Sequence, residues 1–306
     1  MAVSRDAVIW AYRLLLGRNP ESDAVVDAKM AAKDEINLIR ELTGSPEFKT
    51  RKRDKALFGS VEKITALPPA PQKASGPWKT IKFAELPAHC CVNRAEKIAG
   101  TITYPVALQS RLADLTIAFH GEAKPETLIG VALHLKSIPT LRLNICDSDQ
   151  KVSVGEGCTG EWTLRMWGAC NIEIGDRVTS NGVDCFVNPG GSLRVGDDCM
   201  FAQVALHVGD NHAIVDARSG KPLNYSTAPR IEFKSHVWIA SRVMVFANSV
   251  IGAGSILGAG AVVKGDFPAR SMIAGSPAKV LRDGVTWTRS HDGSEAQDVL
   301  KLLRDR

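Results

Sequence analysis

The fold is decided by residues 233–263, which read FKSHVWIASRVMVFANSVIGAGSILGAGAVV. From Phe233 onward every sixth residue is large and apolar; the others are Ile239, Val245, Ile251, Leu257 and Val263. A small or β-branched residue follows four of these at the fourth place: Val243, Ser249, Ser255 and Ala261. An α-helix repeats every 3.6 residues and a strand every two, so neither keeps a period of six on one side. Three hexads that close one triangular coil do, and the stretch therefore predicts a left-handed parallel β-helix.

The same period recurs upstream in two shorter runs, which are Ile174, Ser180, Phe186 and then Val195, Phe201, His207. In this register the side chain of His207 points into the prism. The next apolar position, Phe233, comes 26 residues after His207 instead of six. About twenty residues must therefore leave the prism, and we expect a loop over 208–232. Long excursions on a rigid scaffold are common sites of function.

The chain divides into five segments by composition and pattern. Residues 1–64 show helical spacing, and 65–80 are a proline-rich linker. Residues 81–150 are β-rich, with a topology that the pattern does not assign, and lead into the β-helix at 151–285. The last segment, 286–306, holds a helix predicted over 294–304. The stretches YRLLLGRNP (12–20) and SPEF (45–48) resemble a small bacterial helical domain of unknown function.

Composition excludes several classes of protein. The 38 Lys and Arg residues exceed the 33 Asp and Glu residues by only five, without the basic clusters of a nucleic-acid-binding protein. No uncharged run approaches the ~20 residues that cross a bilayer. Seven cysteines without paired spacing predict neither zinc nor disulfides, and so a cytoplasmic location. With only three Tyr and nine Phe, the prism interior is expected to have little room for large rings.

Five motifs identify a family. They are DNHAIVD (210–216), HVWI (236–239), IGAGS (251–255), GAGAVV (258–263) and AGSPAKV (274–280). Together they resemble the hexapeptide-repeat acyltransferases, most closely the acetyl-CoA-dependent O-acetyltransferases of bacterial capsules and surface sugars. The resemblance implies transfer of acetyl from acetyl-CoA to a hydroxyl of a polysaccharide or sugar precursor in a ternary complex. It also implies a homotrimer with its sites between subunits.

The family's general base falls on His212 in the predicted loop. A sugar hydroxyl is a weak nucleophile at neutral pH, and an imidazole titrating near 6.5 can take its proton. Asp210 and Asp216 are candidates to orient the ring, and Asp210 is taken as part of the catalytic set. An Asp in such a loop can instead close an Asx-turn.

Trp238 comes one residue before an interior position, so its side chain is expected to face outward. The resemblance places this indole at the thioester, beside the histidine; alternatively it packs under the loop. The acetyl-CoA groove needs small walls and cations for the phosphates. The residues assigned to it are Trp238, Ala240, Ala259, Gly260, Lys264, Pro277, Lys279 and Arg282. Ala240 stands where the family has glycine, and Lys279 and Arg282 could equally be solvated surface charges.

Two other functions fit the same prism. One is N-acetylation of an amino sugar nucleotide or a xenobiotic. The other is a metal-dependent hydratase like the γ-class carbonic anhydrases, because His207 and His212 match part of a three-histidine zinc site. That site needs a third histidine, and none occurs between His134 and His207. We therefore expect no metal requirement.

Overall fold

The computed structural model describes residues 22–32, 76–86, 90–92, 100–119, 131–146, 149–224 and 226–304, with single positions at 3, 5, 8, 20, 37, 38, 41, 42 and 45. The chain forms two compact units, Met1–Pro68 and Pro69–Arg306. In the first, helix α2 (Asp23–Met30) begins at Ser22, whose hydroxyl accepts a hydrogen bond from the Val25 N–H. A small apolar core of this unit comprises Val3, Val8, Val26, Leu38 and Leu42. Most of the predicted N-terminal helices lie outside the described residues.

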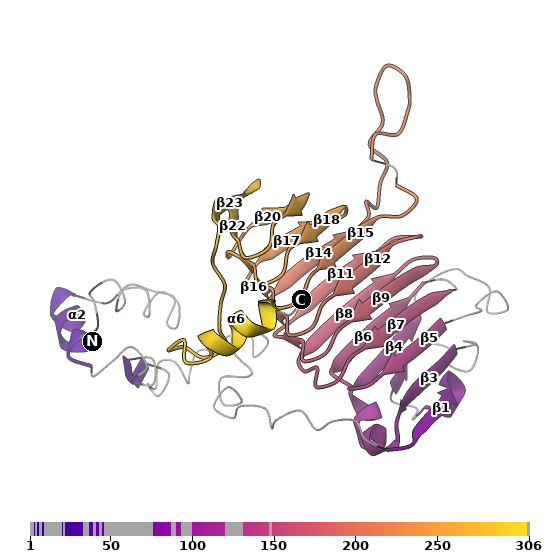
Figure 1. The fold of residues 1–306 in the computed structure, drawn as a ribbon, viewed down its shortest axis with the longest axis horizontal. Coiled ribbons are helices and arrows are strands. Elements are labelled where there is room, and N and C mark those ends of the chain that lie inside the picture. The colour runs from indigo at the N-terminus through magenta and orange to yellow at the C-terminus, as the bar shows by residue number, and fades with distance from the viewer. Residues whose placement is uncertain are drawn as a thin grey trace. The chain divides into compact units, whose positions relative to one another are not determined.

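The second unit is a prism of three sheets, and the predicted left-handed parallel β-helix is confirmed (Figure 1). Sheet A contains β1 (Trp78–Lys82), β3 (Gly100–Pro105), β5 (Val131–Leu135), β7 (Gln150–Val154), β9 (Cys170–Ile174), β12 (Ser192–Val195), β15 (Arg230–Phe233), β18 (Ser249–Ile251) and β21 (Asp266–Phe267). Sheet B contains β2 (Cys91–Val92), β4 (Leu115–Phe119), β6 (Thr140–Ile145), β8 (Glu161–Met166), β11 (Val183–Val187), β14 (Val204–Val208), β17 (Val243–Phe246) and β20 (Val262–Val263). Sheet C contains β10 (Thr179–Ser180), β13 (Met200–Phe201), β16 (Trp238–Ile239), β19 (Ile256–Leu257), β22 (Met272–Gly275) and β23 (Ala278–Arg282). Among these strands, only the pairs β1–β3 and β22–β23 are antiparallel.

The strand register explains where the hexad pattern appears and where it fails. Met244 pairs with Val262, 18 residues on, which is three hexads. Upstream, Val183 pairs with Val204, 21 residues on, so each coil carries extra residues that break the period of six. All six apolar hexad positions between 233 and 263 are buried. Parallel pairing already begins between β3 and β5, so the coils start near residue 100 and not at 151. The predicted linker 65–80 also overlaps β1.

His207 does not point into the prism, and that prediction was wrong. In β14 the side chains of Leu206 and Val208 are buried, so His207 between them faces outward. Its ring stacks between those of Phe186 and Phe246, with centroids 5.5 and 5.2 Å away. The longer coils upstream shifted the true register by one residue from the one read off the hexads.

The interior also holds more large rings than expected. Trp162, Phe201 and Phe233 are fully buried, and their rings pack edge to face with centroid separations of 5.2 and 5.3 Å. Edge-to-face packing lets rings from successive coils share the interior, so the expectation of little room was wrong for this column. At the other end of the chain, helix α6 (Ala296–Arg304) confirms the predicted C-terminal helix. No helix of the described segments is long and apolar enough to cross a bilayer.

Candidate functional site

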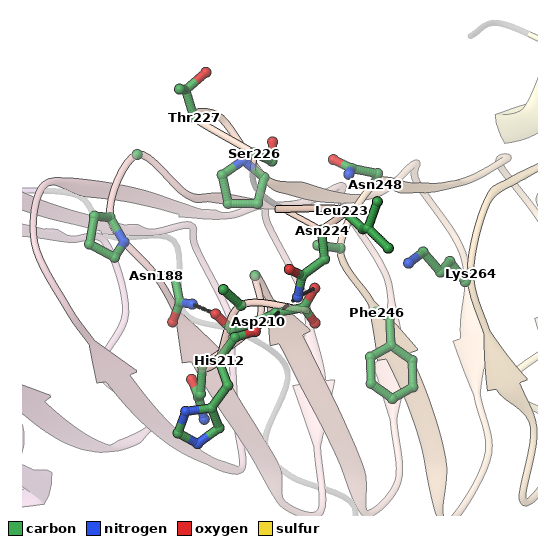
Figure 2. A pocket seen from close by; sticks show the side chains of 17 residues that line it. Asn188, Asp210, His212, Leu223, Asn224, Ser226, Thr227, Phe246, Asn248 and Lys264 are labelled. Atoms are coloured by element: carbon green, nitrogen blue, oxygen red, sulfur yellow. Dashed lines mark hydrogen bonds between the residues drawn. The ribbon is translucent and has the colours of Figure 1, made fainter. Parts of the chain in front are cut away.

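The predicted loop leaves the prism between β14 and β15, at the edge where sheet B turns into sheet A (Figure 1). A β-bridge between Val215 and Pro222 folds its outer part back on itself. Under the loop lies a cavity of about 750 Å³ (Figure 2). Its lining includes Asn188, Asp210, His212, Asn224, Phe246, Asn248 and Lys264. The sequence predicted both the loop and His212, and the structure adds the cavity beside them.

The side chain of Asn224 holds the loop around His212. Its Nδ2 donates to the His212 carbonyl and to Asp210 Oδ2, each at 2.9 Å, while its Oδ1 accepts from the Ile214 N–H at 2.7 Å. From the prism, Asn188 Nδ2 donates to the Asp210 carbonyl at 2.6 Å. The backbone at His212 is therefore fixed, whereas none of the described residues hydrogen-bonds to its exposed imidazole. A ring held in place with both nitrogens open can accept a proton from a bound hydroxyl.

Neither loop carboxylate orients the imidazole in this structure. The carboxylate of Asp210 binds Asn224 instead. Asp216 Oδ1 accepts from the Ser219 N–H at 2.6 Å, the Ser219 hydroxyl at 2.8 Å and the Arg218 N–H at 3.0 Å. These bonds, led by the Ser219 N–H, hold the pKa of Asp216 below its usual value. Asp216 thus closes the Asx-turn that was its alternative role.

Trp238 lies on sheet C and faces outward, with 36% of its surface exposed. It is not among the residues that line the His212 cavity. Most residues assigned to the acetyl-CoA groove share its side of the prism. Ala240, Ala259 and Gly260 lie at turns from sheet C into sheet B, Pro277 lies between β22 and β23, and Lys279 and Arg282 lie on β23. Lys264 is the exception, because it lines the His212 cavity.

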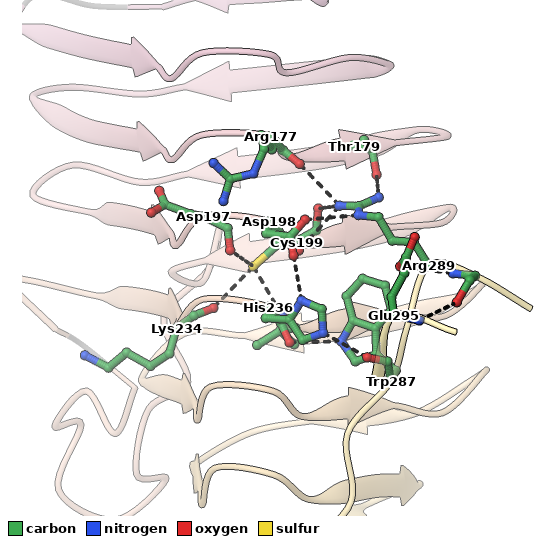
Figure 3. Close-up of polar contacts among 12 residues, drawn as sticks. Arg177, Thr179, Asp197, Asp198, Cys199, Lys234, His236, Trp287, Arg289 and Glu295 are labelled. Carbon is green, nitrogen blue, oxygen red and sulfur yellow. Dashed lines mark hydrogen bonds and ion pairs between the residues drawn. The ribbon is translucent and has the colours of Figure 1, made fainter. Parts of the chain in front are cut away.

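Behind Trp238 the chain that follows the β-helix is fastened to the prism (Figure 3). The rings of Trp287 and His236 stack with centroids 4.2 Å apart, and both residues are buried. Trp287 Nε1 donates to the His236 carbonyl, and His236 Nε2 contacts the Trp287 carbonyl, each at 2.9 Å. The Trp287 ring lies 6.2 Å from that of Trp238. Sequence reasoning missed Trp287, because its partner lies 51 residues away.

Asp198 completes this fastening. Its carboxylate contacts His236 Nδ1 at 2.7 Å and Arg289 Nε at 3.0 Å. Burial is the largest single influence on its pKa and opposes ionisation, but the hydrogen bond from His236 and the charge of Arg289 together outweigh it. The pKa of Asp198 is therefore held below the usual 3.8. The ionised carboxylate ties the C-terminal segment to the coil below Trp238.

We expect Asp198→Asn to lower the free energy of unfolding by ~1–3 kcal/mol at neutral pH, since it removes a charge-assisted contact. A folded-state pKa below the unfolded value contributes stability above that value and loses it as the pH falls further. The difference between wild type and variant should therefore be constant above about pH 5 and shrink below about pH 4. Urea unfolding followed by tryptophan fluorescence measures it, with exposed Asp283→Asn as the control. A difference independent of pH would contradict this account.

Comparison with known proteins adds a relative and a fold. No protein-family model matches the chain. It is 40% identical over 120 residues to the polysialic acid O-acetyltransferase of Escherichia coli O1:K1 / APEC, a match that covers 39% of this chain and 38% of the relative. The chain thus spans under two fifths of that protein's length. The relative confirms the resemblance to O-acetyltransferases that the motifs predicted.

Two solved structures are similar to the chain. The polySia-specific acetyltransferase NeuO aligns with a TM-score of 0.55 at 24% identity, covering 62% of this chain and 81% of that one. The polysialic acid O-acetyltransferase OatWY aligns with a TM-score of 0.48 at 20% identity, covering 62% and 99%. The first of these shows a shared fold.

Proposed function

We propose that the protein transfers acetyl from acetyl-CoA to a hydroxyl of an anionic bacterial polysaccharide, with polysialic acid as the first acceptor to test. The observation that carries the proposal is the imidazole of His212, held by its backbone at a cavity of about 750 Å³. Amide side chains surround it, and amides suit the hydroxyls of a sugar. The 40% identity with an O-acetyltransferase supports the same reaction.

In this proposal His212 acts as the general base. It takes the proton from the acceptor hydroxyl while the oxygen attacks the thioester carbonyl. When the carbon–sulfur bond breaks, the imidazolium returns the proton to the departing thiolate. Acetyl passes directly between two bound substrates, so no acyl-enzyme forms. The reaction belongs in the cytoplasm, and the six described cysteines, all free, suit a reducing compartment.

The two halves of the site lie on opposite edges of sheet B. His212 and Lys264 lie at the edge shared with sheet A, whereas Trp238, Ala240 and Ala259 lie on sheet C or at its edge with sheet B. A cyclic trimer with sheet B facing the threefold axis brings the first edge of one copy to the second edge of the next. We therefore propose a homotrimer whose sites lie between subunits. Each site then takes its base from one copy and its acetyl-CoA groove from another.

The residues on the sheet C side suit acetyl-CoA. Ala240, Ala259 and Gly260 offer small walls, and Gly260 has a φ of +72° with nothing within 4 Å of an added Cβ, so the turn stays low and open. The side chains of Lys279 and Arg282 are exposed on β23 and can pair with phosphates. Trp238 would pack against the thioester end. These roles rest on the geometry of one chain and on the proposed assembly.

Incubating the purified chain with acetyl-CoA and polysialic acid tests the proposal. Thiol release measures turnover, and treatment of the product with mild alkali separates the two acyltransferase functions. An ester is cleaved by alkali, whereas the amide formed by an N-acetyltransferase survives. Amino sugar nucleotides serve as competing acceptors. Transfer to amines alone, or an alkali-stable product, would overturn the proposal of O-acetylation.

A metal-dependent hydratase receives no support from the geometry. Among the described residues, no group of three or more His, Cys, Asp or Glu side chains is placed to hold a metal ion. The ring of His207, which the hydratase would use as a ligand, is packed between Phe186 and Phe246.

A further inference from the structure

The outer face of sheet A carries an exposed tryptophan far from the His212 cavity. Trp78 is the first residue of β1, and 44% of its surface is exposed. Its ring stacks on that of His134 in β5, with centroids 4.9 Å apart and planes 11° apart. The indole is thus held flat against the outside of the sheet and is not part of the core. A fixed aromatic surface of this kind binds flat apolar groups at little entropic cost.

The strand register surrounds this indole with hydroxyls and lysines. Thr80 and Thr103 are paired, and their hydroxyl oxygens lie 2.9 Å apart. Lys82 pairs with Thr101, and two strands further Lys151 continues the same row. We call this surface the Trp78 platform, which consists of the outward side chains of Trp78, Thr80, Lys82, Thr101, Thr103, His134, Lys151 and Ser153.

The chemistry of the Trp78 platform is that of a surface for an anionic sugar polymer. None of the described outward side chains of β1, β3, β5 and β7 is a carboxylate, so Lys82 and Lys151 face no local counter-charge there. The C–H face of a sugar ring can pack on the indole, and its hydroxyls can bond to threonine and serine. Sugar carboxylates can pair with the lysines.

The platform and the His212 cavity lie along one sheet. Sheet A runs in the order β1-β3-β5-β7-β9-β12-β15, and Pro229, directly before β15, lines the cavity (Figure 1). Six strand spacings of about 4.8 Å separate β1 from β15, or about 29 Å. In the proposed trimer sheet B faces the axis, so the outer face of sheet A stays accessible. A polymer can reach both places, whereas a short oligosaccharide cannot.

We propose that the Trp78 platform binds a distant segment of an anionic polysaccharide whose reacting sugar occupies the His212 cavity. The inference rests on the proposed function, which it deepens by adding a second contact with the same acceptor. The platform would keep the polymer attached between successive transfers. It therefore affects long acceptors and leaves the chemistry at His212 unchanged.

The test compares acceptors of different length. Trp78→Ala should raise KM for long polysialic acid about tenfold, as expected for the loss of one well-packed aromatic contact. The kcat/KM for a two- or three-sugar oligomer and the KM for acetyl-CoA should stay unchanged. Trp78→Phe should restore most of the affinity for the polymer, and Val106→Ala, at a neighbouring exposed apolar position, should change nothing. An equal effect on polymer and oligomer, or no effect on either, would overturn the proposal.

Binding without turnover separates this inference from the proposed function. Titration calorimetry with polysialic acid, in the absence of acetyl-CoA, should show binding that Trp78→Ala and Lys151→Ala weaken, while neutral dextran should not bind. If acetyl transfer fails but this binding pattern holds, the platform stands and the proposed reaction falls. If transfer occurs and both variants bind the polymer as wild type does, the platform falls alone. Equal binding of dextran would overturn the assignment of an anionic ligand.

Discussion

His212→Ala should lower kcat by about 10²–10⁴-fold, because it removes the only imidazole among the described residues that line the cavity. The KM for acetyl-CoA should stay nearly constant, since the residues assigned to acetyl-CoA lie mainly on the opposite edge of sheet B. A loss confined to kcat is typical of an interaction made in the transition state. Initial rates of thiol release at saturating polysialic acid measure both constants.

Two variants control this result. His291→Ala removes an exposed histidine that the cavity does not include, and it should leave the rate unchanged. Asn224→Ala removes the amide that fixes the loop at Asp210 and His212, so it should reduce kcat partially while the base is still present. A His212→Ala variant that retains the full rate would end the assignment of His212 as the base.

The extent to which the sequence predicts this fold depends on coil length. Where the repeat is 18 residues, as from Met244 to Val262, the hexads predict which side chains are buried. Where it is 21, as from Val183 to Val204, three extra residues per coil move the register, and His207 was placed inside when it lies outside. Strand alternation within β14 contains the correct answer, since Leu206 and Val208 flank the histidine. The period of two was the better guide there.

For the site, sequence reasoning found groups whose role depends on residue type and missed those whose role depends on contact. His212 and Trp238 are in motifs, so both were predicted. Asn224 was quoted only as part of a motif, and its bonds to the loop come from the fold. Trp287 meets His236 only after five turns of chain have closed the prism between them, and no local pattern shows that contact. The sequence also gave no sign that His212 and Trp238 lie on different edges.

That separation makes Met244 the sharpest test of the proposed assembly. Met244 lies on β17, on the outer face of sheet B, and 39% of its surface is exposed. Ala205 and Val262 flank it on the neighbouring strands, so this part of the face is apolar. In a trimer with sheet B toward the axis, three copies of this patch meet and bury one another. In a single chain a charge at this position meets only water.

Met244→Glu should therefore leave the single chain folded and prevent the trimer, because three carboxylates would be desolvated near one axis. Sedimentation should show a monomer, and acetyl transfer should fall more than a hundredfold, since several kcal/mol of interface energy is lost and no complete site remains. Val106→Glu, at a position equally exposed in the single chain, should keep both trimer and rate. Mixing inactive His212→Ala and Trp238→Ala chains should restore up to about a quarter of the wild-type rate, because some interfaces then pair the intact half of each. A trimeric, fully active Met244→Glu variant, or a mixture without activity, would show that the site does not form across sheet B.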